Sequence, residues 1–304
     1  MGGLLERALI AQGHAVIVVS RNGQGKNRVS WDGVNLGPWA TEIDGADVVI
    51  NLAGRTVNCR YTKENMNDMM QSRVDSTRVV GQAIAQAKRP PRVWLQMSTA
   101  TIYAHRFDAA NDETSGVLGG NESGVPTYWS FSVDIAKAWE QALNEAPTPQ
   151  TRKVALRTSM VMSPDREGIF DVLLRMTRFG LGGAIGGGTQ YVSWIHDHDF
   201  VRAIDHLIAR DDIDGAVNMA SPEPLPQRDF MATLRQTCGM NLGLPAMKWM
   251  AEIGAFLLRT DTELLLKSRR VVPGRLRSSG FVFEFADWSL AAHDLFERWR
   301  AARV

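Results

Sequence analysis

The chain has 304 residues, with 34 Lys and Arg against 33 Asp and Glu, so its formal net charge is +1. This balance gives no positive field that would gather phosphate backbones, which argues against a dedicated nucleic-acid-binding protein. Hydrophobic residues make up 44% and charged residues 22%, as in a globular protein with a large core. No apolar run approaches the ~18 residues of a membrane helix, and no signal pattern precedes the first helix.

The two cysteines, Cys59 and Cys238, are far apart, so neither a disulfide framework nor a zinc cluster is indicated. This favours a reducing compartment, most simply the cytoplasm. The run from His196 to Asp199 alternates His and Asp, but alternate residues at the start of a helix point to different faces. With no distant third ligand group, we expect helix capping there and no metal.

Short β-branched runs alternate with longer helical segments over the first two thirds of the chain. This alternation predicts an α/β fold with a doubly wound, Rossmann-type parallel sheet. The run Ala15–Ser20 is apolar almost throughout, which is typical of a strand buried on both faces. The predicted elements are a helix over Leu4–Gln12, strands over Ala15–Ser20 and Ala46–Ala53, a helix over Lys63–Lys88, a strand over Val93–Met97, a helix over Ser132–Asn144 and a strand over Lys153–Arg157.

The pattern changes after about Arg166, where a Gly-rich stretch leads into a sequence that is mainly helical. The predicted helices are Asp199–Arg210, with Asp197 or Asp199 as N-cap, Arg228–Cys238, Ala246–Leu258, Asp261–Lys267 and Ser289–Ala302. We therefore expect a dinucleotide-binding domain over residues 1–165, a substrate-cleft segment over 166–225 and a smaller helical C-terminal domain over 226–304.

The start of the chain matches part of a dinucleotide-binding unit, which begins with a strand, a Gly-rich turn and a helix. Here the helix and the second strand are present, and Gly2 falls where the last glycine of the fingerprint would be. We interpret the chain as lacking about ten residues of first strand and glycine turn. The alternative is an ordinary N-terminal helix with no relation to nucleotides.

Ser20 and Arg21 follow the strand whose end reaches the adenosine ribose in such a unit. An acidic residue there accepts from the 2′-hydroxyl of NAD, whereas an arginine pairs with the 2′-phosphate of NADP. Because no carboxylate occurs between Arg21 and Asp32, the sequence predicts NADP. The alternative for Arg21 is a solvated loop arginine.

The chain resembles the extended short-chain dehydrogenases/reductases, and among them the YfcH-like epimerase family, which carries its own C-terminal helical domain. Each matching segment is weak alone, but together they run in order along nearly the whole chain. They are Gly13-His14 with Val18 to Arg21, Asn51 to Gly54, Arg60 to Thr62 with Ser72-Arg73, Ser98 to Tyr103, Trp139-Glu140, Leu156 to Thr158, Gly180 to Gly183, Trp194 to His196, and Val271 to Pro273 with Gly280-Phe281.

This resemblance implies a bound NADP(H) and assigns residues to it. It places Ser20 and Arg21 at the 2′-phosphate, and it places other positions along the rest of the cofactor. Those other positions are Leu52, Ala53 and Gly54 in the loop along the adenosine and pyrophosphate, Asp68 and Arg73 on the following helix, and Val161 beside the nicotinamide. Leu52 and Val161 have core packing as their alternative reading.

The resemblance also implies that Thr99 polarises the reacting carbonyl, four residues before Tyr103. The alternative for Thr99 is a hydroxyl that caps its own strand. The Tyr-x-x-x-Lys dyad usual in the superfamily is absent, because its positions hold Ser132 and Ala136. The family shows the same departure, so acid–base chemistry would fall to another group.

The candidates for that acid–base role are Tyr103, His196 and Arg60. Arg60, Trp194 and His196 are also the groups expected to face a small-molecule substrate. Two functions stay open at this point. One is an NADP-dependent oxidoreductase or epimerase acting on a small or nucleotide-linked carbonyl or hydroxyl compound. The other is a non-catalytic NADP(H)-binding sensor or assembly factor on the same fold. The sequence does not indicate the oligomeric state.

Overall fold

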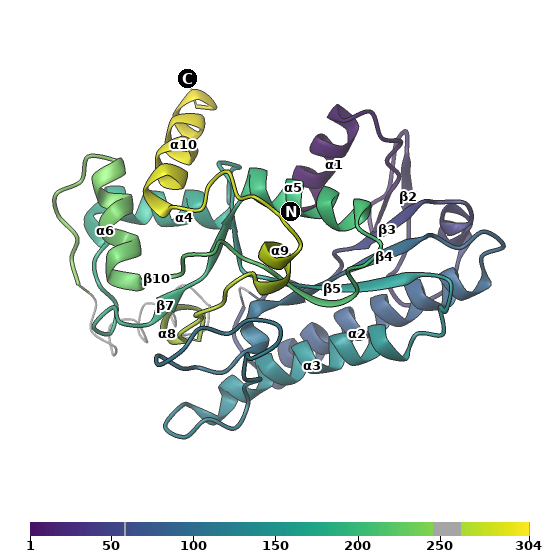
Figure 1. Cartoon of the computed structure of the whole chain (residues 1–304), viewed down its shortest axis with the longest axis horizontal. Helices are drawn as coiled ribbons and strands as arrows, with labels where there is room; N and C mark the ends of the chain where they lie inside the picture. Colours follow the sequence, from purple (N-terminus) through teal and green to yellow (C-terminus); the bar gives the residue numbers. More distant parts are fainter. Residues whose placement is uncertain (58, 246–262, 304) are drawn as a thin grey trace.

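A four-stranded parallel sheet lies at the centre of the computed structural model, which describes residues 1–57, 59–245 and 263–303 (Figure 1). Its strands run in the order β3, β4, β5, β9, and each pairs in parallel with its neighbour. Their bounds are β3 Val48–Asn51, β4 Val93–Thr99, β5 Arg152–Thr158 and β9 Gly215–Met219. The predicted parallel α/β sheet is therefore confirmed.

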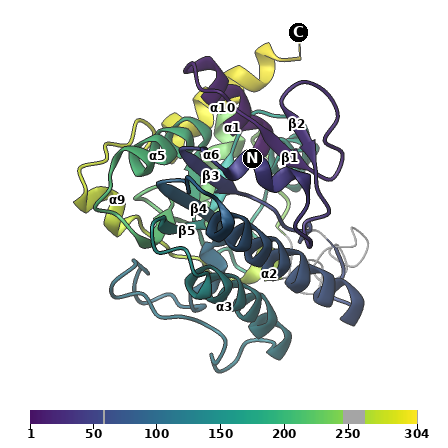
Figure 2. The same cartoon turned by 90° about the vertical axis from the view of Figure 1, so that its right-hand side faces the viewer.

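Helices cover both faces of this sheet. α2 (Lys63–Gln86) and α3 (Ser130–Glu145) run side by side on one face, while α1 (Gly2–Ala11) and α5 (Asp197–Ala209) lie on the other (Figures 1 and 2). The hydrophobic core fills both interfaces, with Leu95 and Leu156 facing α5 and Trp94 facing α2. This two-sided cover confirms the predicted doubly wound arrangement.

The first two strands form a separate parallel pair, β1 (Val18–Ser20) with β2 (Arg28–Ser30). The prediction that this apolar run is buried on both faces was wrong. Ile17 is 46% exposed and β1 is only half-buried. The reason is that, among the described residues, β1 is hydrogen-bonded along one edge only and does not join the four-stranded sheet.

The C-terminal part packs around its own aromatic cluster, which contains Trp194, Phe230 and Trp288. The predicted helices that frame it are confirmed. Its elements are the parallel pair β6 (Met160–Met162) and β8 (Trp194–His196), the antiparallel pair β7 (Tyr191–Val192) and β10 (Leu225–Pro226), and the helices α4 (Ile169–Met176), α6 (Gln227–Thr237), α8 (Glu263–Leu266), α9 (Gly274–Ser278) and α10 (Trp288–Ala301).

Four short helical turns complete the described chain: η1 (Pro38–Ile43), η2 (Ala100–Ile102), η3 (Thr127–Trp129) and η4 (Thr177–Leu181). The helix predicted over Ala246–Leu258 lies outside the described residues, and the one predicted over Asp261–Lys267 is described from Glu263 onward. The aromatic cluster joins segments on both sides of residue 226, and the three-part division of the chain stays a prediction. None of the described helices is long and apolar enough to cross a membrane.

The N-cap of α5 differs from the prediction. His196 caps the helix, because its Nδ1 accepts from the His198 amide at 3.2 Å. Asp197 and Asp199 lie inside the first turn and bind groups far along the chain instead. Asp197 accepts two hydrogen bonds from the Arg298 guanidinium, and Asp199 accepts from the amide of Glu284.

Candidate functional site

The carboxyl ends of the parallel strands are where open α/β sheets bind their ligands. At the end of β3, Asn51 is buried and shapes the loop that follows. Its Oδ1 accepts from the Ala53 amide at 3.0 Å, and its Nδ2 donates to Gln96 Oε1 at 3.0 Å. The loop Leu52–Gly54 is thereby fixed, with Gly54 exposed and Leu52 and Ala53 half-buried.

Arg73 lies directly behind this loop. Its side chain is buried and packs against Gly54, with the guanidinium 5.0 Å from the centre of the Trp139 ring. It donates to the carbonyls of Met69 and Arg55 at 2.9 and 3.0 Å. Burial lowers the pKa of Arg73. In the described part of the chain no carboxylate pairs with it, so a buried positive charge faces the loop without a counter-charge.

Asp68 sits five residues before Arg73 on α2 and forms an ion pair with Arg55. Arg55 also donates to Asn65 Oδ1 at 2.8 Å, and its amide donates to Ser72 Oγ at 3.0 Å. These contacts tie the start of the β3–α2 connection to the helix. They leave Asp68 bound to protein rather than pointing free into the site.

Ser20 and Arg21 lie where β1 ends, as predicted. The carbonyl of Ser20 accepts from the amides of Gly23 and Trp31, and the carbonyl of Arg21 accepts from Ser30 Oγ. The Arg21 side chain is exposed, and its guanidinium makes no hydrogen bond or ion pair with the described residues. Gly2 is the first residue of α1 and is exposed.

Thr99 is the last residue of β4 and is half-buried. Its Oγ accepts from the Thr101 amide at 3.2 Å and so caps the short helix η2. This is the backbone-capping arrangement that was the alternative for Thr99. Its polarising role stays a prediction.

Tyr103 lies deeper, in a buried polar network. Its hydroxyl donates to Asn218 Oδ1 and accepts from Arg157, both at 2.9 Å. Arg157 in turn makes a bidentate ion pair with Glu140, to which Ser98 also donates. Burial raises the pKa of Tyr103. Only 2% of its surface is exposed, so the structure gives it a packed interior position.

A group of charged residues that the sequence analysis missed lies next to Thr101. Glu263 and Lys267 are buried and form an ion pair at 3.4 Å one turn apart, starting in α8. Lys267 donates to the Thr101 carbonyl at 2.9 Å, and Arg269 donates to Thr101 Oγ1 at 3.1 Å. On α3, Ser132 donates to Glu263. The Glu-x-x-x-Lys spacing within an apolar helix was the available signal, since such a pair is costly to bury without a role.

The other predicted residues lie in the hydrophobic clusters, beside α10 and in the loop after β3. Trp194 is buried in the aromatic cluster beside Trp288, with ring centres 4.9 Å apart. His196 is buried, stacks on Phe285 and shares a hydrogen bond with Asp294 at 3.0 Å. Burial lowers the pKa of His196. The half-buried Val161 packs against the core beside the sheet, and the exposed Arg60 follows the β3 loop.

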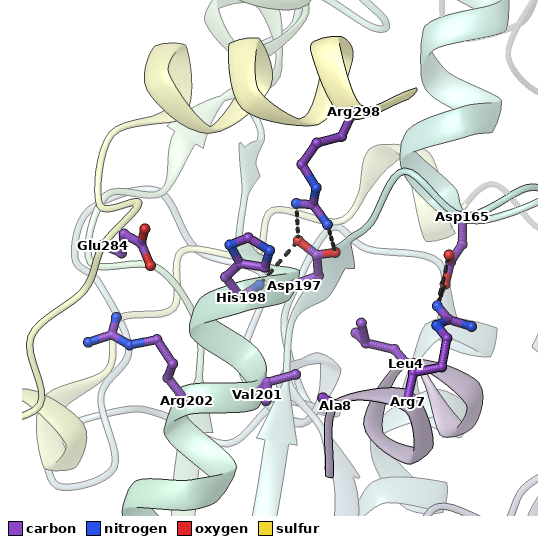
Figure 3. Close-up of a pocket in the computed structure, with 10 residues that line it drawn as sticks. All are labelled: Leu4, Arg7, Ala8, Asp165, Asp197, His198, Val201, Arg202, Glu284 and Arg298. Atoms are coloured by element: carbon purple, nitrogen blue, oxygen red, sulfur yellow. Dashed lines mark hydrogen bonds and ion pairs between the residues drawn. The ribbon is translucent and has the colours of Figure 1, made fainter. Parts of the chain in front are cut away.

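A cavity of about 560 Å³ lies between α1, α5 and α10. Figure 3 shows two ion pairs among its charged side chains, Arg7 with Asp165 and Arg298 with Asp197. Arg202 pairs with Asp199, which is not a lining residue. The cavity's lining residues are Leu4, Arg7, Ala8, Asp165, Asp197, His198, Val201, Arg202, Glu284 and Arg298. Within the described residues, no group of His, Cys, Asp and Glu could hold a metal ion.

Comparison with known families places this geometry in context. Residues 1–220 match the model of the NAD dependent epimerase/dehydratase family. The chain belongs to this family. Residues 248–295 match a domain of unknown function, DUF1731, so the family-specific C-terminal part is present as well. The resemblance to the extended short-chain dehydrogenases/reductases is thereby confirmed.

Several relatives align along most of the chain. Human epimerase family protein SDR39U1 is 28% identical over 298 residues, covering 97% of this chain and 96% of that protein. Epimerase family protein YfhF of Bacillus subtilis is 27% identical over 302 residues, covering 97% and 94%. These similarities extend the family assignment through the C-terminal part.

Two solved structures share the fold. The crystal structure of human SDR39U1 (isoform 2) with NADPH aligns with a TM-score of 0.85 at 26% identity, covering 97% of this chain and 95% of that one. A nucleoside-diphosphate sugar epimerase from Corynebacterium glutamicum aligns with a TM-score of 0.72 at 26% identity, covering 99% of this chain and 59% of that one. The Rossmann-type fold with a smaller helical part is thereby confirmed.

Proposed function

We propose that this protein binds NADP(H) and catalyses oxidation, reduction or epimerisation of a small or nucleotide-linked carbonyl or hydroxyl compound. The observation that carries the proposal is the buried guanidinium of Arg73, which faces the Gly54 loop without a carboxylate partner among the described residues. A buried cation is costly without a counter-charge, and a bound pyrophosphate supplies one. The NADPH in the structure of human SDR39U1 supports the choice of cofactor.

The residues at the sheet edge fit such a cofactor. Gly54 has no side chain and is exposed, so a bound cofactor can approach the backbone of the loop closely. Arg73 would neutralise the pyrophosphate, and the exposed Arg21 at the end of β1 would pair with the 2′-phosphate. Gly2, Ser20, Leu52, Ala53, Asp68 and Val161 keep their proposed places along the same ligand.

The nicotinamide supplies hydride transfer when it is bound. The protein's part is to orient the substrate and to move a proton at the reacting oxygen. We propose that Thr99 lies near the reacting group, since its half-buried hydroxyl is at the carboxyl end of β4. Tyr103, Arg60, Trp194 and His196 stay predictions as acid–base or substrate groups.

A second function is supported by the residues on α3. Ser132 and Ala136 occupy the positions of the usual Tyr and Lys, so a non-catalytic NADP(H) sensor or assembly factor fits the same fold. The two functions differ in one measurement. An enzyme oxidises bound NADPH when offered a carbonyl substrate, whereas a sensor retains it unchanged.

Titration with NADPH and NADH, followed by nicotinamide fluorescence, tests cofactor binding. We expect Arg21→Ala to weaken NADPH binding by about 1.5–3 kcal/mol, because a charge-assisted contact to the 2′-phosphate is lost. NADH binding should change little. The control is Arg78→Ala, which removes an exposed arginine from the middle of α2. Equal weakening of NADPH and NADH, or no binding of either by the wild-type chain, would contradict the proposal.

A further inference from the structure

Tyr61 lies where three separate parts of the chain meet. It precedes α2, and its turn is fixed because the Arg60 carbonyl accepts from the Thr62 amide at 2.9 Å and from Asn65 Nδ2 at 2.8 Å. Its hydroxyl is 3.4 Å from Ser132 Oγ on α3. Tyr61 is half-buried, and the protein holds its phenol through this contact.

The hydrogen-bond directions in this contact follow from its neighbours. Ser132 donates its only hydroxyl hydrogen to the carboxylate of Glu263, which is buried and paired with Lys267. The Ser132 oxygen is therefore left as an acceptor, and the Tyr61 phenol is the donor in their contact. Glu263 and Lys267 thus hold Ser132, and Ser132 holds the phenol.

Two guanidinium groups act on the same phenol. Burial lowers the pKa of both Arg73 and Arg269, and their electrostatic interaction with Tyr61 partly opposes that lowering. The interaction is mutual, so the two positive charges favour a negative charge on the phenol oxygen. Tyr61 therefore combines three features that suit a proton donor: a partly exposed side chain, a hydroxyl held by a neighbouring side chain and nearby cations.

We propose that Tyr61 is the residue that exchanges a proton with the substrate, with Ser132 and Glu263 as its positioning residues. This inference rests on the proposed function and assigns the step that the missing Tyr-x-x-x-Lys dyad leaves open. In the reducing direction the phenol O–H bond breaks as its proton passes to the substrate's carbonyl oxygen, and an alcohol O–H bond forms. NADPH is the two-electron donor to the carbonyl carbon, and the phenolate recovers a proton from water.

The other groups considered for this step are less well placed. Tyr103 is buried and its hydroxyl is committed to Arg157 and Asn218. Lys137 on α3 donates to the carbonyl of Gly119 at 2.9 Å. Tyr61 instead combines partial exposure with a contact to the residue that stands at the dyad's tyrosine position.

A first test does not depend on turnover. The chain has four tyrosines, so replacing them all with 3-fluorotyrosine gives four fluorine NMR resonances. The Tyr61→Phe variant identifies the Tyr61 resonance by its loss, and Tyr103→Phe identifies a buried reference. We expect NADP⁺ to shift the Tyr61 resonance, and Glu263→Gln to shift it also, with the Tyr103 resonance unmoved by either. A Tyr61 resonance that responds to neither change would overturn the proposal.

A second test measures NADPH oxidation with phenanthrenequinone and with a UDP-linked keto sugar as probes. We expect Tyr61→Phe to lower kcat by about 10²-fold or more with unchanged NADPH affinity, because a positioned proton donor is lost. Ser132→Ala should lower kcat less. The control is Tyr191→Phe, which removes the hydroxyl of another half-buried tyrosine, whose ring packs against Arg270, and its activity should be unchanged.

The two proposals fail in different ways. A Tyr61→Phe variant with full activity, or a wild-type chain that binds NADPH and oxidises it with neither probe, overturns the role of Tyr61 and leaves cofactor binding intact. A wild-type chain that does not bind NADPH overturns the proposed function itself. If 3-fluorotyrosine at position 61 moves the pH profile of kcat to lower pH, this supports proton transfer by Tyr61, since a purely structural role would leave the profile in place.

Discussion

Gly54 and Arg73 are in contact, and a Cβ at position 54 would lie 3.2 Å from the guanidinium carbon of Arg73. Arg73 has little freedom to move away, because two backbone carbonyls and the Trp139 ring hold it. Because Gly54 has no side chain, the buried guanidinium of Arg73 can pack directly against the loop. This relationship connects a glycine of the sequence motif with the charge that the proposed cofactor would neutralise.

We therefore expect Gly54→Ala to weaken NADPH binding several-fold, by about 1 kcal/mol, with a small loss of stability. The loss is steric, since the added methyl group displaces Arg73 or the loop. Fluorescence titration with NADPH and urea unfolding measure the two effects. Gly37→Ala is the matched control, because its Cβ would meet Trp39 only at ordinary contact distance, 3.5 Å. Unchanged NADPH affinity in Gly54→Ala would place the cofactor away from this loop.

A second prediction concerns the hydroxyl of Tyr103. Tyr103→Phe leaves Asn218 Oδ1 without its donor and removes an acceptor from Arg157 in a buried network. We expect a loss of about 1–3 kcal/mol in the free energy of unfolding, with NADPH affinity unchanged. Tyr191→Phe, at a half-buried site, should change stability by less than about 0.5 kcal/mol. Urea unfolding measures the change in the free energy of unfolding. A Tyr103→Phe variant that keeps its full stability but loses turnover would favour the catalytic role first predicted for Tyr103.

The sequence predicted the elements of the sheet well, because their signals are local. Strands β4 and β5 and helices α2 and α3 lie within a few residues of their predicted bounds. Burial of β1 was mispredicted, since an apolar run does not reveal whether a strand has neighbours on both edges. The partners of a side chain are harder to predict than its element, because they depend on contacts distant in sequence.

The site illustrates this limit. Arg73 and the Gly54 loop are close in sequence, and one motif locates both. Glu263 is 131 residues from Ser132, and only the folded chain brings them together. His196 was expected to face a substrate, yet it lies buried against α10 because Asp294 reaches it from a helix nearly a hundred residues away.

A third prediction follows from the burial of His196. Burial lowers its pKa below the ordinary 6.5, although Asp197 and Asp294 oppose the shift, while His198 and Arg298 add to it. As pH falls from 7 to 5, the unfolded chain takes up a proton that the folded chain does not, so stability decreases with acidification. The slope is at most about 1.4 kcal/mol per pH unit for this group. Asp294 has a lowered pKa and acts only at more acidic pH.

Urea unfolding at pH 7 and pH 5 measures this slope. His196→Gln should flatten it, leaving the part due to His206, whose pKa burial also lowers. His14→Gln is the control, because it removes an exposed histidine just after α1. A slope that is unchanged in His196→Gln would show that His196 is not held neutral in the folded protein.

A fourth prediction concerns the end of the chain, which is fastened through Asp171. This carboxylate is fully buried and accepts from Trp299 Nε1 and from Arg303, each at 2.7 Å, and it also pairs with Arg175. Burial alone would raise the pKa of Asp171, but these donors outweigh it and hold the pKa at about 2. Its stabilising contribution is therefore fully present above the ordinary value of 3.8 and is lost as the pH falls through about 2.

Asp171→Asn removes the negative charge of this carboxylate. The new amide NH2 group then faces Trp299 Nε1 and the arginines, which are themselves hydrogen-bond donors. We expect a loss of about 3–5 kcal/mol in the free energy of unfolding at pH 7, since a buried ion pair is broken from one side. Glu297→Gln, at an exposed pair with Arg300, should cost less than about 1 kcal/mol. If Asp171→Asn unfolds at the wild-type urea concentration, α10 is held by the aromatic cluster alone. A parallel NADPH titration should show unchanged affinity in whatever fraction stays folded, because Asp171 lies outside the proposed cofactor site.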